Sequence, residues 1–386
     1  MAGALKSAVE SDSGLPVSAS AHNNARAEVR LAALRERIDR INDRLLALLT
    51  ERARLALEIG HLKRANGTGV YQPLREQQII EGLLQRNPGP LTADHIRRIF
   101  TEIISACRAL ERELRVAFLG PEYSYTHLAA MGRFGSSAQF VPADSIAGVF
   151  AAIDAGQADL GVVPVENSTE GSVTLTLDLL IDTPLQIVGE LMLPVRHALL
   201  SLSGERGAIR KIIAHQQALG QCRNYLAANF PHCEQEAVAS NSLAARMAAA
   251  DPAAAAIASA RAAQPYGLRV VADGIQDVAQ NITRFLVIGR EGVARSGADK
   301  TTLIFAVPEK VGALKEALTI FARNSINLSM IQSRPQRSRP WEYVFIVDLN
   351  GHRDDPPMRR ALATLKRKAL FLKVLGSYPE GRPPAD

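Results

Sequence analysis

The amino-acid sequence predicts a multidomain protein in which an all-α unit is followed by a two-lobed α/β unit and then by an α+β unit of ferredoxin-like order βαββαβ. Three observations support this. Apolar residues of the first part recur at heptad spacing, strand-like runs alternate with amphipathic stretches from about residue 115, and the last ~80 residues order their runs as βαββαβ. The chain has 386 residues, enough for two or three domains. We expect a disordered tail at 1–27, the helical unit at 28–114, the α/β unit at 115–290 and the α+β unit at 299–378.

Composition excludes several classes of protein. Hydrophobic residues make up 47% and charged residues 22%, as in ordinary globular proteins, and no apolar run approaches the ~20 residues of a membrane span. The net charge of +6 is mild and no basic run is interleaved with aromatic residues, so we expect neither a nucleic-acid nor a membrane partner. Cys107, Cys222 and Cys233 lack metal-ligand spacing, and there is no Gly-rich phosphate loop, so neither a metal nor a cofactor is expected. The N-terminus does not have the pattern of a signal sequence, and a cytoplasmic protein is expected.

The helical unit is predicted by apolar residues whose spacing alternates between four and three. They are Leu34, Ile38, Ile41, Leu45, Leu48, Leu55, Ile59 and Leu62. Because neither Pro nor Gly intervenes before Gly60, one helix can run from about Glu28 to Lys63. At ~1.5 Å per residue this helix is roughly 50 Å long, so it needs a partner along its length. Pro73 suits the first turn of a second helix, and Thr92 can cap a third.

Arg52 occupies one position of this apolar repeat. A buried guanidinium without a partner is costly, so Arg52 should meet a carboxylate or another anion. Lys63 follows three helical turns later on nearly the same face, Arg35 lies towards the other end, and Arg75 and Glu76 begin the next helix. Two interpretations are open: a structural salt bridge in a coiled coil, or a pocket in which several cations bind a dianion.

The run LAALRERIDRINDRLLALLTERARLALEIGHLKR, followed by YQPLREQQII, resembles the all-helical chorismate mutase domain over about residues 28–115. The resemblance implies an intertwined dimer that rearranges chorismate to prephenate. Arg35, reaching into the other subunit's site, and Arg52 would clamp the substrate carboxylates. Lys63 would donate to the breaking ether oxygen and Glu76 would hold the ring hydroxyl, with Lys63 and Arg52 as the catalytic pair. The implied site comprises Arg35, Arg52, Lys63, Gln72, Arg75, Glu76, Cys107 and Glu111.

Three of these positions depart from the family pattern. Gln72 replaces a common Asp, Cys107 replaces a Ser and Glu111 replaces a Gln. Only a protonated Glu111 could donate to the ether oxygen, and burial that raises the pKa of this carboxyl would make that donation available. We therefore hypothesise that mutase activity falls as the pH rises through the titration of Glu111.

The α/β unit is predicted by short apolar runs separated by amphipathic stretches. The strand-like runs are Val116–Leu119, Leu160–Val165, Ile187–Val188, Ile209–Ala214 and Ala254–Ala258. Strands separated by helices indicate parallel sheets, and the ~175 residues indicate two lobes around a cleft. Ligands bind beyond the carboxyl ends of such strands, so the polar loop that follows Val165 is a candidate binding loop.

Two segments of this unit carry groups suited to a binding site. ENSTEG at 166–171 ends a strand, and NITRF at 281–285 opens the last strand, although either alone is equally well a capped turn. Together with ALGQC at 218–222 and VAFLGP at 116–121, they resemble prephenate dehydratase over about residues 115–290. The resemblance implies a periplasmic-binding-protein-like fold and the loss of carbon dioxide and water from prephenate to give phenylpyruvate.

This resemblance also implies roles for single residues. Thr283 would be catalytic, because the departing hydroxyl needs a proton or a strong hydrogen bond. Arg284 would either support a substrate carboxylate or only orient its loop. The other implied lining residues are Asn167, Ser168, Gln221 and Asn281.

Other positions of the unit are ambiguous. Tyr123 stands where the family usually has Gly, and Ala214 stands where a Ser precedes His215. The isolated His127 and His215 are as consistent with structural roles as with catalytic ones. The exact lining of the site therefore stays open at these positions.

The C-terminal unit has strand-like runs and helical stretches in the order βαββαβ. They are Thr302–Val307, Gly312–Arg323, Asn327–Gln332, Tyr343–Asp348, Met358–Lys368 and Leu372–Tyr378. VGAL at 311–314 and SRP at 333–335 suit ordinary turns, but in this setting they resemble the ACT regulatory domain, which binds phenylalanine across a dimer interface. The implied allosteric residues are Gly312, Ala313, Leu314, Gln332, Ser333, Arg334 and Pro335. Gln332 replaces the usual Glu, and a neutral amide holds an ammonium group less well than a carboxylate does.

The three resemblances follow one another in the order of the bifunctional chorismate mutase/prephenate dehydratase (P-protein) family. They imply chorismate and prephenate as substrates, L-phenylalanine as allosteric inhibitor, and a homodimer or larger assembly. One alternative is a monofunctional prephenate dehydratase whose helical unit only dimerises. Another is a ligand-sensing regulator, which would need a DNA-reading helix that is not evident.

Overall fold

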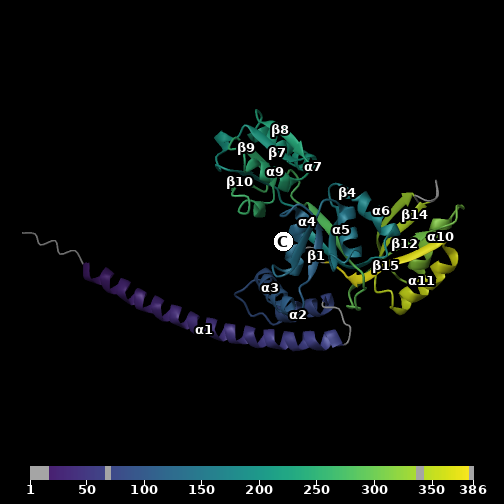
Figure 1. Ribbon diagram of the computed structural model, residues 1–386, viewed down its shortest axis with the longest axis horizontal. Coiled ribbons are helices and arrows are strands. Elements are labelled where there is room, and N and C mark those ends of the chain that lie inside the picture. The colour runs from purple at the N-terminus through teal and green to yellow at the C-terminus, as the bar shows by residue number, and fades with distance from the viewer. Residues whose placement is uncertain (1–16, 66–70, 336–342, 382–386) are drawn as a thin grey trace, which may run out of the picture. The chain divides into compact units, whose positions relative to one another are not determined.

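The computed structural model describes residues 17–65, 71–335 and 343–381 (Figure 1). Within these ranges three helices precede three β-sheets with their covering helices. The chain divides into two compact units, 1–58 and 59–386, and the boundary falls within the first helix. In the described ranges no helix is long and apolar enough to cross a membrane.

The first element, α1 (Val17–Ala65), is one helix that carries the whole apolar repeat. It begins at Val17, so the expectation of a tail up to residue 27 is wrong for residues 17–27. From Val17 to Gly60 the sequence contains no Pro or Gly, so no local signal stops the helix in the expected tail. The apolar side chains of the repeat are all at least 46% exposed. An exposed apolar stripe of this length is typical of a helix that packs against a partner.

Two shorter helices follow, α2 (Pro73–Gln85) and α3 (Ala93–Glu111). Both predicted helix starts are confirmed. Pro73 lies in the first turn of α2, and the Thr92 side chain accepts a hydrogen bond from the backbone N–H of His95 at 3.2 Å. These local signals position α3, whose residues Cys107 and Arg108 are buried.

The first sheet of the α/β unit has the strand order β2-β1-β3-β11-β5, with β4 paired to β3. Its strands and helices are β1 (Arg115–Leu119), α4 (Tyr125–Phe134), β2 (Gln139–Ala143), α5 (Ile146–Asp154), β3 (Leu160–Asn167), β4 (Gly171–Ser172), α6 (Thr174–Asp182), β5 (Gln186–Pro194) and β11 (Ile282–Gly289). β1 is parallel to β2 and β3, whereas β11 is antiparallel to β3 and β5. The prediction of parallel strands is therefore correct for β1, β2 and β3 but wrong for β11, and the sheet is mixed. The chain leaves this sheet at the C-terminal end of β5 and returns to it as β11 at that same end, so β11 must run antiparallel to β5.

The second sheet has the order β10-β6-β9-β7-β8 and is also mixed. Its elements are β6 (Ala198–Ser201), η1 (Arg206–Ala208), β7 (Lys211–His215), α7 (Gln216–Gln221), α8 (Arg223–Asn229), β8 (Glu234–Val238), α9 (Asn241–Ala248), β9 (Ala254–Ala258), η2 (Ala260–Ala262) and β10 (Arg269–Asp273). β7 is parallel to β8 and β9, while β6 is antiparallel to β9 and β10. The Ala-rich stretch forms α9 and then the fully buried strand β9.

The C-terminal unit has the predicted order βαββαβ and one antiparallel sheet, β13-β14-β12-β15. Its elements are β12 (Asp299–Ala306), α10 (Ala313–Arg323), β13 (Leu328–Pro335), β14 (Tyr343–Asn350), α11 (Pro356–Lys368) and β15 (Phe371–Pro379). Figure 1 shows α10 and α11 lying beside these strands. Because side chains alternate along a strand, Leu303 and Phe305 pack towards the helices while Ile304 packs the other way.

The other face of this sheet packs on the first sheet of the α/β unit. Ile304, Ile346 and Tyr378 share one core cluster with Ile187 of β5. At Gly376 a Cβ atom would lie 2.1 Å from the Ile187 carbonyl oxygen, so only glycine allows β15 to come this close. The shared core therefore ties the C-terminal unit directly to the strands that flank β11.

Candidate functional site

In the helical part, the structure pairs Lys63 with Glu111. Their Nζ and Oε2 atoms are 2.9 Å apart, and the side chains are only 18% and 11% exposed. Gly60 makes this approach feasible, because a Cβ there would lie 3.0 Å from the Glu111 Cβ. Two residues implied by the mutase resemblance are thus brought together from helices 48 residues apart in sequence.

Glu76 is buried and has a cationic partner that the sequence analysis missed. Arg108 Nη1 lies 2.5 Å from Glu76 Oε1, and Arg108 Nη2 donates to the carbonyl oxygen of Phe134 at 2.6 Å. The signal was present in the sequence: a buried carboxylate requires a cation, and Arg108 follows Cys107 on the buried face of α3. Glu76 therefore already holds one charged partner.

The structure does not test the convergence of the remaining mutase candidates. Arg35 and Arg52 lie on the part of α1 that belongs to the first compact unit, so their convergence on Lys63 stays a prediction. Gln72 is half-buried at the N-cap of α2, Arg75 is exposed and Cys107 is buried.

In the α/β unit, four predicted residues form one hydrogen-bonded chain. Asn167 Nδ2 donates to Thr283 Oγ1 at 2.8 Å and lies 2.7 Å from Asn281 Oδ1. Asn281 Nδ2 in turn donates to Gln221 Oε1 at 3.0 Å. Asn167 ends β3, Thr283 is the second residue of β11, and register pairs the two residues, so sheet geometry fixes their contact. A hydroxyl that accepts one hydrogen bond still has its own proton to donate.

Ser168 completes the same loop through the backbone. Its hydroxyl accepts a hydrogen bond from the Ile282 N–H at 2.9 Å, and its own N–H donates to the Ile282 carbonyl oxygen at 2.9 Å. Ser168 therefore fixes the path of the chain immediately before Thr283.

Two further residues extend this chain, and the sequence analysis did not identify them. His197 Nε2 is 2.8 Å from Gln221 Oε1, and its Nδ1 is 3.0 Å from the Tyr125 hydroxyl, which also donates to the Arg196 carbonyl oxygen. Burial lowers the pKa of His197, and burial raises the pKa of Tyr125. His197 lies on the connection between β5 and β6, where no motif announces a polar site. His197 is identified only in the folded structure, where the connection between β5 and β6 lies beside Gln221.

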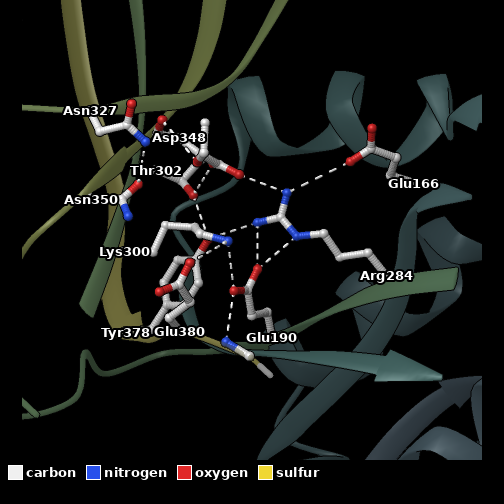
Figure 2. Close-up of polar contacts among 12 residues, drawn as sticks. Glu166, Glu190, Arg284, Lys300, Thr302, Asn327, Asp348, Asn350, Tyr378 and Glu380 are labelled. Carbon is white, nitrogen blue, oxygen red and sulfur yellow. Dashed lines mark hydrogen bonds and ion pairs between the residues drawn. The ribbon is translucent and has the colours of Figure 1, made fainter. Parts of the chain in front are cut away.

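Arg284 lies among buried carboxylates (Figure 2). Its Nη2 is 2.6 Å from Glu190 Oε2 and its Nη1 is 2.6 Å from Asp348 Oδ2, with the arginine side chain 9% exposed. Whether Arg284 supports a substrate carboxylate or only orients its loop stays a prediction. Successive residues of a strand face opposite sides, so Thr283 and Arg284 point away from each other. Burial works to lower the pKa of Arg284, but Tyr378, Asp348 and Glu190 outweigh it and the pKa is raised.

Both isolated histidines make contacts within the fold. His127 is buried, stacks on Phe118 with ring centroids 4.4 Å apart, and accepts a hydrogen bond from the Tyr123 N–H. Burial lowers the pKa of His127. His215 caps α7 by accepting from the Gln217 N–H. Tyr123 has φ 60°, the left-handed conformation that glycine adopts most easily, which explains why a glycine suits this position.

The predicted allosteric residues fall on two elements of the C-terminal unit. Gly312, with φ 83°, is the N-cap of α10, which begins with Ala313 and Leu314. Gln332, Ser333, Arg334 and Pro335 end the edge strand β13. Arg334 Nη2 and Nε each lie 2.7 Å from Oδ1 of Asp178 on α6, so this motif contacts the α/β unit.

The predicted dehydratase residues, all within the described ranges, coincide with neither a metal site nor the hollow beside α7. Among the described residues, no group of three or more His, Cys, Asp or Glu side chains is arranged to hold a metal ion. A hollow of about 710 Å³ lies against α7, α8 and β8, but none of the predicted dehydratase residues lines it.

Comparison with known proteins follows the same division of the chain. Residues 34–112 match the family model for chorismate mutase type II, residues 116–293 that for prephenate dehydratase, and residues 301–367 that for the ACT domain. The chain is 43% identical to the bifunctional chorismate mutase/prephenate dehydratase of Aquifex aeolicus over 91% of its length and 98% of that protein. The bifunctional protein of Stutzerimonas stutzeri is also 43% identical over the same shares. A crystal structure of prephenate dehydratase with L-Phe from Arthrobacter aurescens is similar, with a TM-score of 0.65 and 35% identity over 70% of this chain and 92% of that chain.

Proposed function

The chain belongs to the bifunctional chorismate mutase/prephenate dehydratase family, and from this premise we propose how its own residues perform and regulate the two reactions. The enzyme rearranges chorismate to prephenate and converts prephenate to phenylpyruvate in phenylalanine biosynthesis. The observation that carries this conclusion is the match of mutase, dehydratase and ACT models, in this order, to one chain. The named relatives are bifunctional, which favours two activities over a monofunctional dehydratase.

For the mutase reaction, we propose that cations hold the substrate in its compact conformer. The rearrangement is unimolecular and needs no nucleophile, so orientation and charge stabilisation supply the catalysis. Lys63 would donate to the ether oxygen as negative charge develops there, and Arg52 and Arg35 would bind the two carboxylates. The Lys63–Glu111 pair supports this role, because Glu111 keeps the Lys63 ammonium in place when the site holds no substrate.

For the dehydratase reaction, Thr283 would donate its proton in a hydrogen bond to the departing hydroxyl. As the ring carboxylate leaves as carbon dioxide, its bonding electrons enter the ring and expel the hydroxyl as hydroxide, which is hydrogen-bonded to Thr283 and becomes water by taking a proton from the solvent. Asn167 supports this assignment, because its amide donates to Thr283 Oγ1 and so directs the threonine proton outward. Asn281, Ser168 and Gln221 would complete the lining.

The finer features of assembly and regulation are proposals as well. L-phenylalanine would inhibit allosterically through the ACT domain, using the residues of the α10 N-terminus and the end of β13. The exposed apolar stripe of α1 supports an intertwined homodimer or larger assembly. The two mixed sheets joined by two chain crossings are consistent with a periplasmic-binding-protein-like architecture. The three cysteines are free thiols, which supports a reducing, cytoplasmic location.

One incubation tests the proposal. Purified protein is given chorismate, and prephenate and phenylpyruvate are followed separately with and without phenylalanine. We expect both products in sequence, with less phenylpyruvate when phenylalanine is present. Conversion of supplied prephenate without any consumption of chorismate would overturn the mutase assignment and leave the helical unit as a dimerisation element.

A further inference from the structure

A buried cluster of charged residues lies between the dehydratase strands and the C-terminal sheet (Figure 2). Arg284 of β11 and Glu190 of β5 come from one side, and Lys300 of β12 and Asp348 of β14 come from the other. Glu190 is the centre: its Oε2 lies 2.6 Å from Arg284 Nη2, and its Oε1 lies 2.7 Å from Lys300 Nζ. The side chains of Glu190 and Asp348 are 0% and 1% exposed. The cluster lies outside the hydrogen-bonded chain of Asn167, Thr283, Asn281 and Gln221.

The cluster balances its charge, with two cations and two carboxylates in its interior. Glu166 and Glu380, both more than 40% exposed, approach its rim at 4.0 Å and 3.9 Å. Asp348 uses its second oxygen to accept from the Thr302 hydroxyl at 2.6 Å, and Thr302 also contacts the Tyr378 hydroxyl at 2.6 Å. Burying four charges is costly, and an apolar core would hold two sheets together equally well. The charges therefore need a reason beyond stability.

The position of Arg284 supplies that reason. It follows Thr283 directly on β11, and the pairing of β11 with β3 shifts register between Arg284 and Phe285. A strand bulge of this kind re-aims the side chains next to it. The ion pairs of Arg284 with Glu190 and Asp348 thus fix the backbone next to Thr283.

The other end of the cluster leads to the regulatory motif. Asp348 lies on β14, and β14 pairs with β13, which contains Gln332 and Arg334. One contiguous path of backbone pairing and ion pairs therefore runs from the motif through Asp348 and Arg284 to Thr283. Such a path is a physical candidate for coupling two sites.

We propose that Asp348 is a positioning residue of the dehydratase: through Arg284 it fixes the segment of β11 that carries Thr283, and it transmits the state of the C-terminal domain to that hydroxyl. The proposal rests on the proposed function, in which Thr283 serves the dehydratase and phenylalanine binds the C-terminal domain. Asp348 acts through Arg284 and makes no contact with substrate in this account.

The test compares four variants of the full chain with the wild type. Asp348→Asn keeps the size of the side chain and removes its charge, and Asp348→Glu restores the charge. Thr302→Val removes the hydroxyl that holds Asp348. Thr301→Val is the matched control, because Thr301 is an equally buried neighbour on β12 that contacts Ser377 and Gly351 instead of the cluster. For each variant we would measure dehydratase kcat and KM, mutase rate, phenylalanine binding by calorimetry, and the inhibition at saturating phenylalanine.

For Asp348→Asn we expect dehydratase kcat to fall about tenfold with little change in KM, below the hundredfold that a ~1 Å misplacement can cost. Mutase rate should stay normal, phenylalanine should still bind, and inhibition at saturation should become weaker. Asp348→Glu should recover part of both losses, Thr302→Val should show a smaller version of them, and Thr301→Val should resemble the wild type.

Wild-type kcat together with wild-type maximal inhibition in Asp348→Asn would overturn the proposal. If Asp348→Asn also loses mutase activity, the variant is misfolded and Thr302→Val becomes the test. Normal dehydratase kcat and normal inhibition in Thr302→Val would then contradict the proposal. Failure of the proposed function has a different signature: Thr283→Ala would retain dehydratase activity, or phenylalanine would not bind the wild type.

Discussion

The two candidate sites of this protein differ in whether their predicted residues lie within one compact unit of the chain. In the α/β unit, Asn167, Thr283, Asn281 and Gln221 form one hydrogen-bonded chain. In the helical part, Lys63 pairs with Glu111, whereas Arg35 and Arg52 lie on the part of α1 that belongs to the other compact unit. Strand register thus brings the predicted dehydratase residues together. In the intertwined dimer that we propose, a second copy of the chain would complete the mutase site.

The largest expected effect tests whether the two sites are independent. Lys63→Ala should lower mutase activity at least ~10³-fold and leave the dehydratase intact, because the donor to the ether oxygen is lost. Thr283→Ala should do the reverse. Separate assays on chorismate and on prephenate measure both rates in each variant. If each variant lost both activities, two independent sites would be the wrong description.

A second prediction tests whether mutase activity, but not dehydratase activity, depends on dimer formation. Leu45→Asp places a charge in the exposed stripe of α1 and should dissociate the dimer that we propose, lowering mutase activity about a hundredfold while dehydratase activity changes less than about twofold. Arg44→Ala, on the same helix but outside the repeat, is the control. Analytical ultracentrifugation gives the assembly state. A Leu45→Asp protein that stays dimeric with full mutase activity would contradict the prediction.

A third prediction sharpens the chemistry of the helical site. Glu111→Gln removes the negative partner that holds the Lys63 ammonium at 2.9 Å. If holding Lys63 is the role of Glu111, mutase kcat/KM should fall about tenfold in this variant, because an amide binds an ammonium group less well than a carboxylate does. Assays on chorismate measure the two proteins, with the dehydratase rate as the internal control. Unchanged or higher mutase kcat/KM in Glu111→Gln would contradict this role.

A fourth prediction concerns the regulatory motif. Gln332→Glu should increase sensitivity to phenylalanine about threefold, because a carboxylate binds the amino acid's ammonium group better than an amide does. The concentration for half-inhibition of the dehydratase measures this, with mutase rate as the internal control. Equal or weaker sensitivity in the variant would count against the role given to Gln332.

The smallest expected effect is on stability. The pKa of His197 is lowered from 6.5 in the fold by burial, so below about pH 6.5 the unfolded chain takes up a proton that the folded chain resists. The stabilising contribution is complete above that pH and is lost as the pH falls. Thermal unfolding should therefore shift less between about pH 7.5 and pH 5.5 in His197→Gln than in the wild type. Identical shifts would show that another group, such as His127, dominates.

Much of the fold was predictable because its signals are local. The apolar repeat of α1, Pro73 and Thr92 as helix starts, and the βαββαβ order of the C-terminal unit all depend on neighbours a few residues away. The errors arose where distant segments decide. β11 is antiparallel because the chain returns to the sheet only after it has formed the second lobe. The residues around Ile282 carry no local signal of this return.

The candidate sites divide in the same way. The sequence by itself determined which chemistry is present: Lys63, Glu111, Asn167 and Thr283 were identified from motifs, because motifs record residue type and spacing. Only the tertiary structure decided which side chains contact each other. Arg108 as the partner of Glu76, His197 as a neighbour of Gln221, and Arg284 turned away from Thr283 into the buried cluster all depend on contacts between remote strands and helices. The physical reason is that a buried charge or amide must find a partner, but local sequence does not say which distant segment supplies it.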